Sequence, residues 1–179
     1  PGTLEVSDTF TTLVNPGVPI PPETTEIHRI TQAEVDVAPS FAAMAPAISA
    51  RLQGCLVVGH NVAFDLKFLS AEYHHAGLTM PGLAGGRLPF ACTLEGARMH
   101  LPISRHRLGL CCEHLGISLE GWHAALADTM ATAELARRLL DLAEAKDPGR
   151  KGRVTARPEW YGSVIPTGEL PQLAVVGRA

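Results

Sequence analysis

The sequence predicts an α/β fold, because short buried strands are followed closely by helices at two places. Leu56-Val57-Val58 is an apolar run with two β-branched residues, which is typical of a buried strand. The run breaks at Gly59-His60-Asn61, and the apolar spacing from Phe64 to Leu69 then predicts a helix. Phe90-Ala91-Cys92 repeats the pattern as a short strand before a helix over 94–99.

The elements before this first strand are predicted from alternation, prolines and a cap. Leu4 to Val14 alternates loosely between apolar and polar residues, which predicts a strand. Val18 to Glu26 is rich in proline and is expected to be an extended connector. A short helix is predicted over Gln32 to Val35. Ser40 is a suitable N-cap for a longer helix that reaches Leu52.

The second half of the chain is predicted to be mainly helical up to a clear end. The helix after the first strand should end at Gly77, and a further helix should cover Arg107 to Leu115. The last long helix is expected to reach about Ala145. We predict one domain over 1–146, followed by a flexible tail over 147–179 that contains proline and glycine.

Two carboxylates and a histidine stand out by their positions. Asp65 lies in the first predicted helical turn after a buried strand, a position that faces the ligand crevice in open α/β sheets. Asp128 lies at the start of the last helix, and His123 lies in the loop that leads into it. The alternative is that both acids only favour a helix N-terminus, where negative charge is stabilised, and that His123 is an ordinary loop residue.

Composition limits the classes of function. With 46% hydrophobic residues and a mean hydropathy of +0.11, the chain should be globular, and no run approaches the roughly 20 apolar residues of a membrane helix. A net charge of −3 argues against a broad basic surface for duplex nucleic acid. The four cysteines form no Cys-x-x-Cys pair, so a reducing cytoplasm is expected and a zinc site is not.

One basic segment is a candidate contact for phosphates. Arg98, Arg105 and Arg107, together with His100 and His106, could form a local strip. The alternative is a solvated loop with no such role.

Several segments together resemble a known family. His60-Asn61-Val62-Ala63-Phe64-Asp65 is similar to the second motif of the DnaQ-like (DEDDh) 3′–5′ exonucleases, and the segment from His123 to Asp128 resembles their third motif, His-x4-Asp. Thr12 to Gly17 and His28 to Thr31 match the connecting segment of the proofreading branch, and Leu108 to Ile117 matches the helix and turn before the third motif. The resemblance covers about residues 3–142.

The resemblance implies a ribonuclease H-like mixed sheet flanked by helices and a site for two divalent ions, Mg²⁺ or Mn²⁺. Asp65 and Asp128 would be metal ligands, and His123 would be the catalytic general base. The family's Asp-x-Glu motif is absent from this chain. We therefore expect the chain to lack the first two strands of the sheet, to be a fragment of a longer protein, and to be inactive or nearly so by itself.

The resemblance also implies substrate contacts. His28 and Ile30 would lie beside the 3′-terminal nucleotide, although Arg29 stands where the family usually has glycine. Asn61 and Phe64 would shape the substrate groove. A surface role for His28 and a core position for Phe64 are the alternatives.

The expected function is removal of nucleoside monophosphates from 3′ ends of single-stranded or frayed DNA. An exonuclease that trims RNA 3′ ends is one alternative, because the same site hydrolyses either backbone. The other is a catalytically dead nucleic-acid-binding or scaffold module. The resemblance implies a DNA polymerase or the sliding clamp as a partner. Gln172 to Val176 faintly resembles a clamp-binding pentapeptide but lacks its aromatic residue, and the favoured alternative is a tail with no such role.

Overall fold

The computed structural model describes residues 6–81, 89–119, 125–146, 161–162 and 173–175. Its helices are α1 Pro22–His28, α2 Gln32–Asp36, α3 Phe41–Leu52, α4 Val62–His75, α5 Thr93–His100, α6 Leu108–Leu115 and α7 Ala125–Lys146. Its strands are β1 Leu56–Gly59, β2 Phe90–Cys92, β3 Tyr161–Gly162 and β4 Leu173–Val175. The predicted α/β class and all six predicted helices, α2 to α7, are therefore present.

The four strands form one mixed sheet in the order β3-β2-β1-β4. Strand β1 pairs in parallel with β2 on one side and with β4 on the other, and β3 pairs antiparallel with β2. Two short pieces of the predicted tail thus add strands to the sheet. The backbone of β1 consequently has a hydrogen-bonded neighbour on each side.

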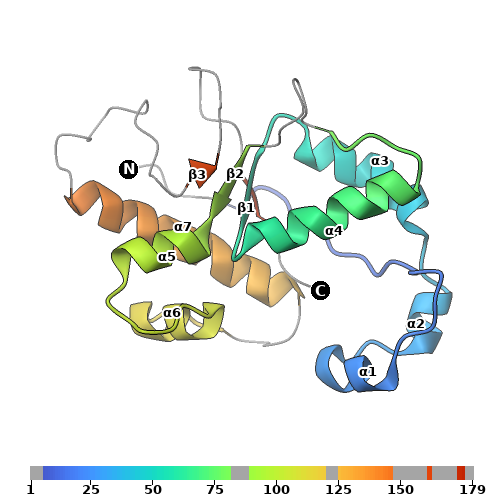
Figure 1. Cartoon of the computed structure of the whole chain (residues 1–179), viewed down its shortest axis with the longest axis horizontal. Coiled ribbons are helices and arrows are strands. Elements are labelled where there is room, and N and C mark those ends of the chain that lie inside the picture. Colours follow the sequence, from blue (N-terminus) through green and yellow to red (C-terminus); the bar gives the residue numbers. More distant parts are fainter. Residues whose placement is uncertain (1–5, 82–88, 120–124, 147–160, 163–172, 176–179) are drawn as a thin grey trace.

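Alternation along β1 divides the core between two faces of the sheet. Leu56 and Val58 are buried against α5, α6 and α7, in one cluster with Leu135 and Leu139. Val57 is buried on the opposite face, in a second cluster with residues of α3 and α4. Figure 1 shows the same division, with α3 and α4 on one side of β1 and β2 and with α5, α6 and α7 on the other.

Two predictions for the N-terminal part are wrong. The described residues 6–14 form no strand, and residues 6–13 are exposed, because alternation alone gives no strand without a neighbouring strand to accept its hydrogen bonds. The segment predicted to be an extended connector contains α1, which begins at Pro22. Proline is tolerated there, because the first residues of a helix have no intrahelical acceptor for their N–H groups.

Local signals explain where several helices begin and end. The Ser40 hydroxyl accepts a hydrogen bond from the N–H of Ala43 and caps α3 as predicted. Thr31 and Glu34 form a capping box at the start of α2. Gly116 ends α6 with a left-handed backbone, at φ 65°.

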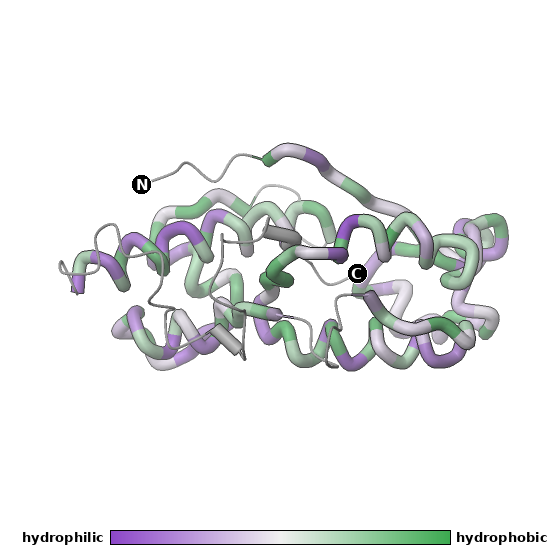
Figure 2. The backbone as a smooth tube through the Cα atoms, turned by 90° about the horizontal axis from the view of Figure 1, so that it is seen from above, coloured by the Kyte–Doolittle hydropathy of each residue, from purple (hydrophilic) through white to green (hydrophobic). Residues whose placement is uncertain are grey.

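All four cysteines are free. Figure 2 shows hydrophilic and hydrophobic residues interspersed along the described chain. Within the described part of the chain, no helix is long and apolar enough to span a bilayer.

Candidate active site

The turn between β1 and α4 positions the first candidate carboxylate. Gly59 is buried at the end of β1, and a Cβ there would lie 3.0 Å from Cβ and Cγ2 of Val62. Asn61 follows with a left-handed backbone, at φ 67°, a conformation that asparagine tolerates better than most residues. Helix α4 then begins at Val62, and Asp65 lies half-buried in its first turn.

His60 ties this turn to two other segments. Its Nε2 lies 2.7 Å from the carbonyl oxygen of His106, and its Nδ1 lies 3.0 Å from the hydroxyl of Thr93. Because a carbonyl only accepts, Nε2 carries the proton that it donates to His106. Thr93 is fully buried at the start of α5. His60 therefore joins the end of β1 to α5 and to the loop before α6.

The second candidate carboxylate, Asp128, lies half-buried in the first turn of α7. Its charge acts on Cys112 of α6, whose pKa is raised to about 11, first by burial and then by the neighbouring Cys111 and Asp128. Figure 1 shows the first turns of α4 and α7 at the same end of the sheet, where β1 ends. Asp65 and Asp128 are thus both presented from helix N-terminal turns at that end.

The predicted general base, His123, lies outside the described residues, and its role stays a prediction. It directly precedes the start of α7 in the sequence, two residues before Ala125.

The predicted substrate contacts are not all brought to this end of the sheet. Figure 1 shows α1 and α2 set apart from the end of β1. His28 ends α1, and its Nδ1 accepts a hydrogen bond from the N–H of Ile30 at 3.0 Å. Arg29, between them, has a left-handed backbone at φ 62°. Asn61 lies in the turn before α4, and Phe64 lies on the first turn of α4.

The alternative that Phe64 belongs to the core is wrong. Its side chain is 47% exposed, and its ring lies 4.7 Å from that of Phe68, which is 56% exposed. The apolar spacing of α4 predicted a buried face, but the residues that α4 buries completely are Val62 and Tyr73.

Asp65 and Asp128 supply the oxygen donors that Mg²⁺ and Mn²⁺ prefer. The described residues nevertheless contain no group of three or more His, Cys, Asp or Glu side chains placed to hold a metal ion. The two carboxylates are therefore of the right chemical type for such ions but are not, by themselves, a complete set of ligands.

Comparison with known proteins identifies the family. The sequence profile of the RNase_T family, described as Exonuclease, matches residues 2–136. The chain belongs to this exonuclease family. The predicted family and the predicted ribonuclease H-like fold class are confirmed.

Two curated relatives and one solved structure illustrate the similarity. The chain is 32% identical over 166 residues to a DNA polymerase III subunit epsilon-like protein of Rhodobacter capsulatus, covering 92% of this chain and 23% of the relative. It is 36% identical over 132 residues to a PolC-type DNA polymerase III of Clostridium perfringens, covering 73% of this chain and 9% of the relative. The chain thus spans less than a quarter of either relative.

The solved structure is the nuclease domain of 3′hExo, a DEDDh family member, bound to rAMP. It superposes with a TM-score of 0.66 at 22% identity and covers 78% of this chain and 74% of that chain. At this identity the likeness concerns the fold.

The structural role of His60 cannot be predicted from the sequence. In the sequence His60 is only one residue of a motif, whereas in the structure its contacts with Thr93 and with the His106 carbonyl join segments that are far apart along the chain. No periodicity or spacing indicates such a long-range contact.

Proposed function

We propose that this chain is the nuclease part of a metal-dependent 3′–5′ exonuclease that releases nucleoside monophosphates from single-stranded or frayed DNA 3′ ends. The observation that carries the proposal is the placement of Asp65 and Asp128 in the first turns of α4 and α7, at the same end of the sheet, in a member of the exonuclease family. The names of the two relatives, both DNA polymerase III proteins, favour DNA and a replicative polymerase as partner.

His123 has the role of general base in this proposal. An imidazole that titrates near neutrality can accept the proton of the attacking water and release it again in each cycle. Asp65 and Asp128 would be ligands of two divalent ions, which in such sites lower the pKa of water and stabilise the leaving oxygen. Since the described residues offer no third ligand placed with them, activity would require a chain that also supplies the Asp-x-Glu pair, and we propose little or no activity for these 179 residues alone.

The test is release of nucleotide from a 3′-labelled DNA strand by a longer protein that contains this chain, in the presence of Mn²⁺. Asp128→Asn and His123→Ala should each abolish release. Asp141→Asn is the matched control, because Asp141 is an exposed acid of the same helix that pairs with Arg137 on the surface. Wild-type release rates in both site variants would refute the roles proposed for these residues.

A ribonuclease is the second candidate, favoured by the fold likeness to a nuclease domain bound to rAMP. Only contacts to the 2′-hydroxyl would separate the two substrates. The rates of nucleotide release from matched DNA and RNA oligonucleotides, measured with the same preparation, decide between the two substrates. Faster release from RNA would favour the ribonuclease over the DNA exonuclease.

A non-catalytic binding module is the third candidate, and the incomplete ligand set of the described residues favours it. Calorimetry with Mn²⁺ on the longer protein separates this candidate from an enzyme. Binding of two ions supports catalysis, and no binding supports a module. The predicted clamp contact stays a prediction, and three residues of its pentapeptide form β4, paired with β1.

A further inference from the structure

The loop between α5 and α6 is the most basic described segment of an otherwise acidic chain. No Asp or Glu occurs from residue 96 to residue 112, whereas Arg98, Arg105 and Arg107 and two histidines do. The chain as a whole carries a formal charge of −3. Among the described residues, this stretch is therefore a local concentration of positive charge.

Ion pairing separates the arginines of this stretch into two kinds. Arg98 pairs with Glu95 along α5, just as the arginines of α3 and α7 pair with carboxylates: Arg51, Arg137 and Arg138. Arg105 and Arg107 are exposed, and neither forms an ion pair within the described residues. Of the described arginines, only Arg29 shares this property. The charges of Arg105 and Arg107 are thus available to an external anion.

The His60 contact fixes this loop beside the candidate active site. The hydrogen bond from His60 Nε2 holds the backbone of His106, the residue between the two arginines, at 2.7 Å. His106 adds a bond within the loop, from its Nε2 to the carbonyl of Leu101 at 3.4 Å. Since His60 lies in the turn that leads into the helix of Asp65, the two arginines lie on a loop anchored to that turn.

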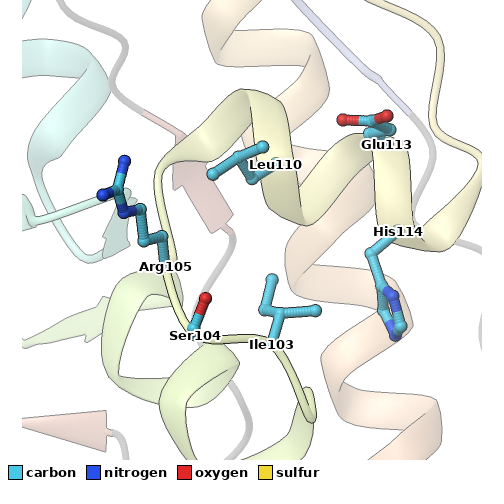
Figure 3. Close-up of a pocket in the computed structure, with 6 residues that line it drawn as sticks. All are labelled: Ile103, Ser104, Arg105, Leu110, Glu113 and His114. Atoms are coloured by element: carbon cyan, nitrogen blue, oxygen red, sulfur yellow. The ribbon is translucent and has the colours of Figure 1, made fainter.

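A pocket next to the loop limits where an anion can lie. It is an open pocket of about 320 Å³, lined by Ile103, Ser104, Arg105, Leu110, Glu113 and His114. Figure 3 shows Arg105 at one end of it, with Glu113 and His114 from α6 at the other. The carboxylate of Glu113 disfavours a phosphate at its own end. The arginine end is the one that favours negative charge.

We propose that this loop, through Arg105 and Arg107, contacts the phosphates of the single-stranded nucleic acid whose 3′ end enters the site, and that His60 is a positioning residue for the loop. The inference rests on the proposed function, which places the strand end beside Asp65. Guanidinium groups suit this task because they keep their charge and can donate two parallel hydrogen bonds to one phosphate. A sugar-phosphate backbone that passes the end of β1 would meet the guanidinium groups of Arg105 and Arg107, which form no ion pair within the described residues, on one anchored loop.

The test measures binding of the wild-type chain to fluorescein-labelled oligo(dT) by anisotropy, in EDTA and over a series of salt concentrations. Each phosphate contact on a single strand contributes about −0.7 to the slope of log affinity against log salt. Arg105→Gln and Arg107→Gln should each make the slope shallower by about 0.7, and the double variant by about 1.4. Arg98→Gln and Arg137→Gln, which remove the same charge from paired positions, should leave the slope unchanged.

His60 is tested in the same assay. His60→Ala, which removes the donor to His106, should weaken binding and make the slope shallower, with both arginines still present. His60→Gln keeps an N–H donor and should restore part of the slope. A role limited to stability would lower the unfolding midpoint of both variants without changing the slope of folded protein.

The inference is overturned if the double arginine variant keeps the wild-type slope, if the control variants lose as much slope as the loop variants, or if the chain does not bind the oligonucleotide. Its failure is distinguishable from failure of the proposed function. If the longer protein releases nucleotide but the arginine variants keep the wild-type slope, only the role proposed for the loop is refuted. If the arginine variants have shallower slopes but the longer protein releases no nucleotide, only the proposed nuclease activity is refuted.

Discussion

Replacing Gly59 by alanine tests whether close packing between β1 and α4 sets the position of the Asp65 helix. The new methyl group would lie 3.0 Å from Cβ and Cγ2 of Val62 and 3.2 Å from its Cα. The optimum for two carbon atoms is about 3.5–4.0 Å, so the methyl is roughly 0.5 Å or more too close. Val62 is completely buried, so it can move away only if the first turn of α4 shifts. Overpacking of this kind costs about 1–3 kcal/mol.

Urea unfolding followed by circular dichroism measures this cost as a lower midpoint at an unchanged slope. Val62→Ala removes one of the clashing atoms, Cγ2, so the double variant should lose about 1 kcal/mol less than the sum of the single variants. Gly54→Ala is the control. Its Cβ would meet nothing within 4 Å, and its cost of about 1 kcal/mol comes from a left-handed backbone, at φ 74°. That cost should add to the cost of Val62→Ala. Full additivity at Gly59, or wild-type stability of Gly59→Ala, would refute the reasoning.

Three further predictions concern stability and reactivity. Arg29→Gly should raise the free energy of unfolding by about 0.5–1 kcal/mol, because Arg29 has a left-handed backbone. A lower unfolding midpoint in urea would contradict this. The pKa of Glu134 is lowered to about 2, mainly by a hydrogen bond from Arg137. Since the folded pKa lies below the ordinary 4.5, the stabilisation is present above about pH 4.5 and is lost as the pH falls through 2. Because this side chain is 36% exposed, screening limits the effect to about 1 kcal/mol. Glu134→Gln should flatten the pH dependence of unfolding in that window, and an unchanged profile would count against the pair. Burial raises the pKa of Cys112 to about 11, so iodoacetamide at pH 8 should modify it only after unfolding, and later than the half-buried Cys55. Mass spectrometry of the labelled peptides decides the order.

The strand-turn-helix at the candidate site could be predicted because its signals are local. The strand predicted over Leu56 to Val58 is one residue shorter than β1, and the helix that follows ends near Gly77 as expected. A run of β-branched residues, a glycine against a buried valine and an asparagine with positive φ act within a few positions of one another. The long helices were predicted for the same reason. Their caps and periodicity lie within the helix itself.

The sheet could be predicted only in part, because a strand forms only when it pairs with another strand, and the local sequence does not indicate which segment that is. Residues 6–14 alternate like a strand and have no ladder partner among the described residues. Strand β4, by contrast, is only three residues long and pairs with β1 across more than a hundred positions. Pairing between segments so far apart in the sequence depends on closing a long loop, and the three residues of β4 contain no local pattern that predicts it. The tail was therefore predicted without its strands.

The motif that carries the family resemblance gives each of its residues a different physical task. Val62 packs into the core, Asn61 supplies a left-handed turn, and His60 reaches across to the His106 carbonyl. Asp65 lies in the first turn of α4 and is the residue to which the proposed function assigns a metal ion. If the proposed function is right, a change at any of the other three residues should affect the reaction through the position or the surroundings of that carboxylate. We therefore expect Asn61→Val, which places a β-branched residue at positive φ, to lower stability by about 1–2 kcal/mol and nuclease activity together. Asp65→Asn should abolish activity at nearly wild-type stability. If Asn61→Val lowered stability and left activity intact, the turn would not position the carboxylate.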